Sequence, residues 1–256
     1  MDSNIRLVIS NEARLGIFLV VIFFLVYVGG RLLLKGVALL ESAEPADQMI
    51  SIKEINRGNL YERQVIFTFD GGSADQSGEK ILAVLAKHGA KGTFFLTGRF
   101  IDSNQDLVRK IIYSGHEVFN HTYNHPHLIQ LSEEEIATEF RKTELSLNIV
   151  AGVSTKPFFR PPYGDRDDRV LRAAFKEGYQ SVYWTVDAGD WEESLGISAE
   201  EVKARILNNV APGNIYLMHL GDKITGEILD DVLTAIEIKG YRVVSLGEGI
   251  IYSNDQ

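Results

Sequence analysis

The stretch VIFTFDGGS, residues 65–73, decides the fold. Its first five residues are all β-branched or aromatic, the types that β-strands favour. They predict a buried strand over Val65–Phe69 that delivers one carboxylate, Asp70, into a turn made of two glycines. Two features therefore need an explanation: the acid that ends so apolar a strand, and Gly71, which follows it and offers only backbone.

Composition sets the limits within which this strand must act. With 256 residues, of which 45% are hydrophobic, the chain is long enough for one large α/β domain. Its 35 acidic residues outnumber 26 Lys and Arg residues, and the formal net charge of −9 argues against binding to nucleic acid. The sequence has no cysteine, which excludes thiolate zinc sites and cysteine nucleophiles. Any metal must therefore be held by His, Asp or Glu.

Strand and helix patterns alternate from residue 65 to the end of the chain. The expected strands are Val65–Phe69, Thr93–Leu96, Glu117–Asn120, Pro157–Phe159, Ser181–Thr185, Ile215–Met218 and Arg242–Ser245. The expected helices are Glu79–Lys87, Leu107–Ser114, Ser132–Val150, Asp168–Glu177, Ala199–Asn209 and Glu227–Lys239. Ser132 and Ser198 each precede a glutamate by three residues, which is the capping-box pattern of a helix N-terminus. Seven strands alternating with helices predict an α/β fold, most simply a closed or nearly closed (β/α) barrel of parallel strands.

Polar residues gather where the expected strands end. Besides Asp70, they occur in NHTYNH (120–125), RPPYG (160–164), DAGDW (187–191) and LMH (217–219). In a (β/α) barrel, catalytic residues lie at the carboxyl ends of the strands. Taken singly, each stretch has an ordinary interpretation as a turn, a cap or a core histidine. Together, in chain order and each at a strand end, they predict an active site.

His121 and His125 carry the spacing of a metal-binding pair. On one helical turn, residues four apart point the same way, as two imidazole ligands must. Pro126 disfavours helix at His125, so any such turn must be short.

The five motifs resemble those of the polysaccharide deacetylase (NodB-like) family of carbohydrate esterases. The resemblance covers roughly residues 50–250. TFDGG stands where the family has Thr-Phe-Asp-Asp-Gly, and HTYNH, RPPYG, DAGDW and LMH match the remaining family motifs in the family's order. The resemblance implies a distorted barrel of about seven strands. It also implies metal-dependent removal of N-acetyl, or sometimes O-acetyl, groups from sugars.

Four residues take catalytic roles by this resemblance. Asp70 would act as the general base that takes a proton from water, with Arg160 holding its carboxylate in place. His219 would protonate the leaving amine, because an imidazolium can give up a proton near neutral pH. Asp190 is implied as the partner of that histidine.

Other residues are implied as binding groups. A divalent metal ion, with zinc the first choice, would be held in part by His121 and His125. The backbone N–H of Tyr163 would stabilise the oxyanion. Trp191 and Leu217 resemble the walls of a pocket for the acetyl group.

Gly71 departs from the family pattern, which has a metal-binding aspartate at this position. Without it, two neutral imidazoles remain around a dication, so metal binding is expected to be weaker. Three accounts are open: water fills the gap, Asp75 or His127 replaces the ligand, or the metal is absent. If the ion is retained, Gly71→Asp is expected to tighten its binding.

Two other functions stand beside an active deacetylase of an envelope polysaccharide. One is a catalytically inactive homologue that binds glycan through the same groove, and the other is a deacylase of a lipid-linked sugar. Retention of both Asp70 and His219 favours an active enzyme, because a binding groove needs neither a proton donor nor a proton acceptor. The sequence does not indicate an oligomeric state.

The N-terminal segment differs from the rest of the chain. LGIFLVVIFFLVYVGG, residues 15–30, has no charged residue, and the leucines after Arg31 extend it to the length of a membrane-spanning helix. A cleaved signal peptide is the alternative. The expected divisions are a single-pass membrane anchor at 1–40, a linker at 41–50 and the deacetylase-like domain at 51–256. That domain is expected on the periplasmic or extracellular side of the cell membrane, where envelope glycans lie.

Overall fold

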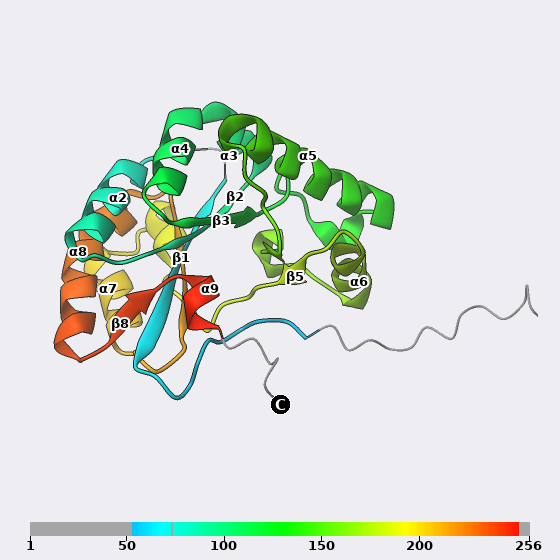
Figure 1. Cartoon of the computed structure of the whole chain (residues 1–256). Coiled ribbons are helices and arrows are strands. Elements are labelled where there is room, and N and C mark those ends of the chain that lie inside the picture. Colours follow the sequence, from blue (N-terminus) through cyan, green and yellow to red (C-terminus); the bar gives the residue numbers. More distant parts are fainter. Residues whose placement is uncertain (1–52, 73, 251–256) are drawn as a thin grey trace, which may run out of the picture. The chain divides into compact units, whose positions relative to one another are not determined.

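A parallel sheet of eight strands organises residues 53–72 and 74–250, the part of the chain that the computed structural model describes (Figure 1). The strands are β1 (Gln64–Gly71), β2 (Thr93–Leu96), β3 (Glu117–Asn120), β4 (Phe158–Phe159), β5 (Gln180–Ser181), β6 (Val186–Asp187), β7 (Ile215–His219) and β8 (Arg242–Val244). Their order is β5-β4-β3-β2-β1-β7-β6, and β8 also pairs with β1. The expected parallel α/β architecture is confirmed, with β5 and β6 at the two ends of the path.

One predicted strand is wrong in its extent. Ser181–Thr185 is not continuous, because β5 ends at Ser181 and β6 begins at Val186. The two short strands pair with opposite ends of the sheet, β5 with β4 and β6 with β7. The residues between them cross from one end of the sheet to the other, so they cannot follow a single ladder.

Helices cover the outside of the sheet (Figure 1). They are α2 (Gly78–Lys87), α3 (Gly98–Ser103), α4 (Gln105–Tyr113), α5 (Glu133–Ala151), α6 (Asp168–Lys176), α7 (Ala199–Leu207), α8 (Lys223–Ile238) and α9 (Leu246–Gly249). Both predicted capping boxes form, at the starts of α5 and α7. The sequence interpretation missed α3 and α9, which span only six and four residues.

Side chains of β1 alternate between the two sides of the sheet. Phe67 and Phe69 point outward and pack among the helices, whereas Ile66 points inward into a second apolar cluster. Burying each such side chain stabilises the fold by about 1.5–3 kcal/mol. By the same alternation Asp70 points inward and Gly71 outward.

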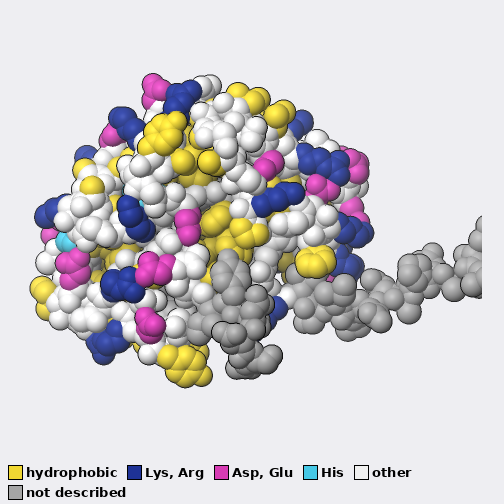
Figure 2. Space-filling view, in the orientation of Figure 1, with side chains coloured by type: hydrophobic (Ala, Val, Ile, Leu, Met, Phe, Trp, Pro, Cys, Tyr) yellow, Lys and Arg dark blue, Asp and Glu magenta, His cyan; other side chains and the backbone are white. Residues whose placement is uncertain are grey.

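The face of the molecule drawn in Figure 2 carries Lys and Arg side chains interspersed with Asp and Glu. The described part of the chain has several such surface pairs, among them Arg141 with Glu177 and Lys176 with Glu133. Exposed pairs of this kind each contribute about 0–1 kcal/mol, so they do not determine the fold.

The predicted membrane anchor and linker, residues 1–40 and 41–50, lie outside the described residues. Within the described part of the chain, every helix is too short or too polar to cross a membrane.

Candidate active site

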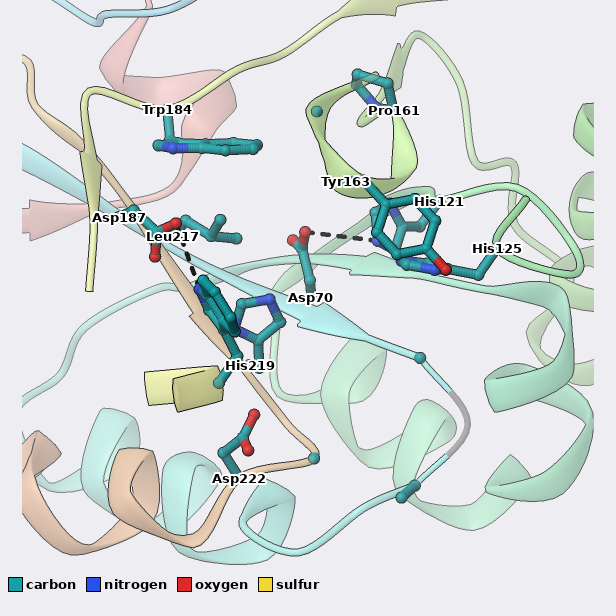
Figure 3. Close-up of a pocket in the computed structure, with 15 residues that line it drawn as sticks. Asp70, His121, His125, Pro161, Tyr163, Trp184, Asp187, Leu217, His219 and Asp222 are labelled. Atoms are coloured by element: carbon teal, nitrogen blue, oxygen red, sulfur yellow. Dashed lines mark hydrogen bonds and ion pairs between the residues drawn. The ribbon is translucent and has the colours of Figure 1, made fainter. Parts of the chain in front are cut away.

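The carboxyl ends of the strands open into a cavity of about 550 Å³ (Figure 3). Seven of the nine predicted site residues line it: Asp70, His121, His125, Tyr163, Trp191, Leu217 and His219. The other two, Arg160 and Asp190, are fully buried and bond to residues of the lining. The sheet register explains part of this convergence, because Asp70 on β1 lies directly opposite His219 on β7.

Arg160 fixes the carboxylate of Asp70. Its Nη1 donates hydrogen bonds to Asp70 Oδ1 at 2.7 Å and to Thr68 Oγ1 at 2.8 Å. The guanidinium lies over the ring of Phe95, 4.2 Å from its centroid. Burial lowers the pKa of Arg160, and the charge of Asp70 opposes that shift. Asp70 is thereby held by one oxygen, while the other lies 3.5 Å from Nε2 of His121.

His219 is held and charged by Asp190. The Nδ1 atom of His219 lies 2.9 Å from Asp190 Oδ1, and the His219 backbone N–H donates to Oδ2 at 2.7 Å. Thr225 also donates to Oδ2. Burial alone would lower the pKa of His219, but the hydrogen bond and charge of Asp190, with other carboxylates nearby, raise it to about 9. The imidazole is therefore protonated at neutral pH, and Nε2 is free to give a proton to a ligand in the cavity.

His121 and His125 are both neutral. Nδ1 of His121 lies 2.8 Å from the carbonyl oxygen of Arg160, which can only accept, so Nδ1 carries the proton and Nε2 is bare. The two rings meet edge to face with centroids 4.9 Å apart. Burial lowers the pKa of each, that of His125 to about 4. A neutral imidazole with a bare nitrogen is the form that binds metals.

A loop, not a helical turn, brings the two histidines together, so the expectation of a helical pair is wrong. Thr122 and His125 adopt left-handed backbone conformations with φ of 65° and 60°. Buried Glu139 of α5 holds this loop by accepting the backbone N–H groups of Tyr123 and Asn124 at 2.9 and 2.7 Å. The i, i+4 spacing predicted the proximity correctly but for the wrong reason.

Gly71 is crowded on the side of β1 opposite to Asp70. A Cβ atom at this position would lie 2.6 Å from Leu96 Cδ2 and 3.1 Å from Leu220 Cδ1. An aspartate here could approach the histidines only if these leucine side chains shifted. The glycine therefore permits close packing behind the site at the same position where the family pattern has a ligand.

Neither proposed substitute for the missing ligand lies in the cavity lining. Asp75 Oδ1 accepts the backbone N–H of Gly78 at 2.8 Å, at the start of α2. His127 pairs through Nδ1 with Asp165, and its ring stacks on Tyr163 with centroids 4.0 Å apart. Both side chains already have other partners. The structure therefore does not favour replacement of the missing ligand by Asp75 or His127.

The predicted binding residues form the walls of the cavity. Tyr163, in a left-handed conformation with φ of 58°, meets the ring of His125 edge to face at 4.5 Å. Leu217 is buried on β7, while Trp191 is exposed at the cavity rim. The Nε1 atom of Trp191 donates to Asp187 Oδ2 at 3.4 Å.

Among the lining residues that the sequence interpretation missed, three carry an aromatic or charged side chain: Trp184, Asp187 and Asp222. Trp184 lies two residues before β6 and Asp187 is its last residue, in the region where the expected strand was misplaced. Asp187 begins the DAGDW motif, whose pattern alone does not indicate a role for it. Asp222 follows LMH by three residues and has no local pattern that marks it.

The side chain of Asp222 does not cap the helix that follows it. It stands at the N-cap of α8 but makes no capping hydrogen bond. Glu193 instead accepts the backbone N–H of Lys223 at 3.0 Å. The Asp222 carboxylate therefore remains close to His219 and Asp190, within 4.8 Å of a ligating atom of each. Burial and the charge of Asp190 raise the pKa of Asp222 to about 6.

Two groups of residues in the described part of the chain are candidates for binding a metal ion. Asp190, His219 and Asp222 lie close together, but the hydrogen bonds of Asp190 are already made and His219 is protonated. At the histidine pair, the bare Nε2 of His121 faces an oxygen of Asp70, an arrangement that a cation between them stabilises. The histidine pair therefore fits a divalent ion, with fewer protein ligands than the three of a typical catalytic zinc site.

Comparisons with known proteins agree with the motifs. Residues 57–182 match the polysaccharide deacetylase family. The chain is 36% identical over 193 residues to a peptidoglycan-N-acetylglucosamine deacetylase of Bacillus cereus, covering 74% of this chain and 69% of the relative. It is 31% identical over 191 residues to the peptidoglycan-N-acetylmuramic acid deacetylase PdaA of Bacillus subtilis, covering 75% and 73%.

The chain is also similar to a solved structure of a protein described as inactive. A family 4 carbohydrate esterase described as a pseudoenzyme, from Bacillus anthracis, is 31% identical with a TM-score of 0.71 and covers 78% of this chain and 69% of its own. A mutant of that pseudoenzyme, described as having restored enzymatic activity, is 32% identical with a TM-score of 0.73, covering 78% and 72%. The fold is thus shared by active and inactive proteins.

Proposed function

The chain belongs to the polysaccharide deacetylase family of enzymes, and from this premise we propose that it removes N-acetyl groups from an amino sugar of peptidoglycan or another envelope polysaccharide. The observation that carries the proposal is the placement of Asp70 and His219 side by side on β1 and β7, each held by a buried partner. One accepts a proton and the other is charged to donate one, which amide hydrolysis requires.

Asp70 serves as the general base. Arg160 engages Oδ1 and keeps the carboxylate oriented, so that Oδ2 can take a proton from the attacking water. The water oxygen then bonds to the acetyl carbon and forms a tetrahedral intermediate. The backbone N–H of Tyr163 is the proposed donor to the developing oxyanion.

His219 serves as the general acid. It transfers the Nε2 proton to the sugar nitrogen as the C–N bond breaks, which yields acetate and a free amine. Asp190 holds Nδ1–H throughout and stabilises the charged imidazolium. Trp191 and Leu217 enclose the methyl group of the acetyl.

His121 and His125 would hold a divalent metal ion, with zinc favoured by its preference for imidazole ligands. When bound, such an ion supplies Lewis-acid polarisation of the acetyl carbonyl. Solvent is the proposed occupant of the place left open by Gly71.

We also propose that residues 1–40 anchor the enzyme in the cell membrane with residues 51–256 on the periplasmic or extracellular side. The apolar length of the segment and the location of envelope glycans support this arrangement. The protein should then remain with membranes after alkaline extraction and be released only by detergent. Recovery of a soluble form that begins near residues 38–46 would contradict an uncleaved anchor.

A second candidate is a glycan-binding protein without activity. The specific observations that favour it are the glycine at position 71 and the similarity to a pseudoenzyme. Both candidates predict glycan binding, and only the first predicts acetate.

The test is a substrate panel. Purified protein would be incubated with chitooligosaccharides and with intact peptidoglycan, with and without a chelator, followed by mass spectrometry of the digested glycan. A loss of 42 mass units per acetyl group, located on glucosamine or muramic acid, would identify the substrate (C₂H₃O exchanged for H, roughly 42 Da). Binding without any mass loss on either glycan would favour the second candidate.

A further inference from the structure

Three side chains stack behind one wall of the cavity. The rings of Trp184 and Tyr183 are nearly parallel, with an interplanar angle of 14° and centroids 3.8 Å apart. The guanidinium carbon of Arg166 lies 3.8 Å from the centroid of the Tyr183 ring. Of the three, only Trp184 lines the cavity.

The stack is fixed at its outer end. Arg166 donates two hydrogen bonds to Glu54, at 2.9 and 2.7 Å. Hydrogen bonding to Glu54 raises the pKa of Arg166. Ser181 on β5 donates a further hydrogen bond to Glu54 at 2.7 Å. A ring held in this way loses little conformational freedom when a ligand binds to it.

The stack is also packed against the turn that carries Arg160 and Tyr163. Gly164 in this turn has φ of 72°, and a Cβ atom there would lie 2.7 Å from Tyr183 Oη and 3.0 Å from Trp184 Cη2. Only glycine fits so close an approach in that conformation. The position of Trp184 is therefore set relative to the catalytic residues.

The ring of Trp184 offers an apolar surface to a ligand. Tyr183 covers one face, the guanidinium carbon of Arg160 lies 5.8 Å from the ring centroid, and the remaining part of the half-buried ring faces the cavity. In Figure 3 it lies on the side of the cavity away from His121 and His125, near Leu217 and Asp187. The cavity, at about 550 Å³, falls within the range of about 300–1,000 Å³ typical of ligand sites and is larger than one acetamido group requires.

Asp187 adds polar acceptors beside this ring. Its Oδ1 accepts the backbone N–H of Gly189 at 2.8 Å, and its Oδ2 accepts the long hydrogen bond from Trp191. Each carboxylate oxygen has lone pairs left for hydroxyl donors. A flat apolar face beside free acceptors complements a pyranose ring, whose C–H groups form an apolar face and whose hydroxyls project from its edge.

We propose that Trp184 is a stacking platform for the sugar unit next to the one that is deacetylated, so that the site binds an oligomeric glycan more tightly than a single sugar. The proposal rests on the glycan-binding function above but not on catalysis. Trp184 would contribute affinity that grows when the ligand extends from one sugar unit to several.

The chain contains two tryptophans, Trp184 and Trp191, which permits a direct measurement. In the full chain in detergent, Trp191→Phe leaves Trp184 as the single tryptophan. Titration with chitotetraose should change its emission, because stacking removes water from the ring. Binding of N-acetylglucosamine and of chitotetraose would also be measured by calorimetry in Trp184→Ala and Trp184→Phe.

Trp184→Ala should weaken chitotetraose binding about 10-fold and leave N-acetylglucosamine binding unchanged, whereas Trp184→Phe should keep most of the affinity. Tyr113→Ala, an exposed aromatic on α4, is the matched control and should have no effect. Equal weakening of both ligands in Trp184→Ala would overturn the proposal, as would unchanged emission at saturation or absence of chitotetraose binding to the wild type. Tetramer binding that depends on Trp184, without acetate release, would support the platform while contradicting the deacetylase.

Discussion

The two sides of the cavity differ in how many of the required hydrogen-bond partners and ligands the protein itself supplies. The proton-transfer side comprises Asp70, Arg160, Asp190 and His219, and the histidine side comprises His121 and His125. On the proton-transfer side, buried hydrogen bonds fix every charged group. On the histidine side, two neutral rings stand beside a glycine where the family pattern has a ligand. The difference teaches that the chain holds its proposed acid and base with its own buried hydrogen bonds, whereas a metal ion at the histidine side would need further ligands besides the two imidazoles.

The largest effect is expected from Asp70→Asn, which removes the base. Deacetylation should fall by about 10²–10⁴-fold, the usual contribution of general acid–base catalysis. The free energy of unfolding should also fall, by up to about 3–5 kcal/mol, because fully buried Arg160 loses its counter-charge. Acetate release and urea denaturation measure the two effects.

Asp75→Asn is the matched control, because Asp75 lies in the following loop and caps α2 instead of lining the cavity. It should leave the rate of acetate release unchanged. Equal loss of activity in both variants would mean that the loop conformation matters and that Asp70 is not the base.

The next effect concerns the acid and its pH dependence. His219, with a pKa of about 9, stays protonated across the neutral range and loses its proton as the pH rises through 9, so activity should decline there. The stability that its raised pKa contributes should be complete below about pH 6.5 and lost over the same rise. In Asp190→Asn, a pKa back at its ordinary value of about 6.5 would lower activity about 30-fold at pH 8.

The pH–rate profile measures this shift. Asp187→Asn lines the same cavity but does not bond His219, so its high-pH limb should match the wild type. An unchanged limb in Asp190→Asn would contradict the assignment of His219 as the acid.

A smaller effect is expected at Gly71. Gly71 faces away from the cavity, so Gly71→Asp should tighten metal binding about 10-fold only by displacing Leu96 and Leu220, and this crowding should lower the stability of the metal-free protein by about 1–3 kcal/mol. Gly71→Ala introduces the same crowding without a carboxylate. Titration with Zn²⁺ should therefore separate the two variants, and equal metal affinity in both would show that position 71 does not reach the ion.

The smallest effect is expected from Asp222→Asn. Its carboxylate helps to hold the proton on His219, so its loss should move the high-pH limb to lower pH by less than one unit. Burial raises the pKa of Asp222 to about 6, and the side chain is uncharged below that value. The variant should therefore match the wild type at pH 5 and differ from it only above about pH 6, as profiles of the two proteins would show.

The motif residues could be predicted from sequence because each stands at the end of a strand whose apolar pattern is local. The convergence of Asp70 and His219 follows from strand alternation and parallel pairing. The alternation along β1 also implied that Gly71 faces away from Asp70, once the strand is known to extend that far.

Other parts of the site depend on contacts between distant residues. Glu139 shapes the histidine loop from α5, and no local pattern connects the two. Asp222 is free to face His219 only because Glu193 caps α8 in its place. Ser181–Thr185 has the composition of one strand, yet it bridges two ends of the sheet. In each case tertiary contacts override the local signal.

The central claim is that the cavity hydrolyses acetamides with Asp70 as base and His219 as acid. The most direct test is acetate release from chitotetraose by the full chain in detergent, supplied in turn with Zn²⁺, Co²⁺ or a chelator. The account predicts metal-dependent acetate from the wild type and loss of it in Asp70→Asn and in His219→Ala. Bound chitotetraose with no acetate under any metal condition would contradict it and identify the protein as a glycan-binding homologue.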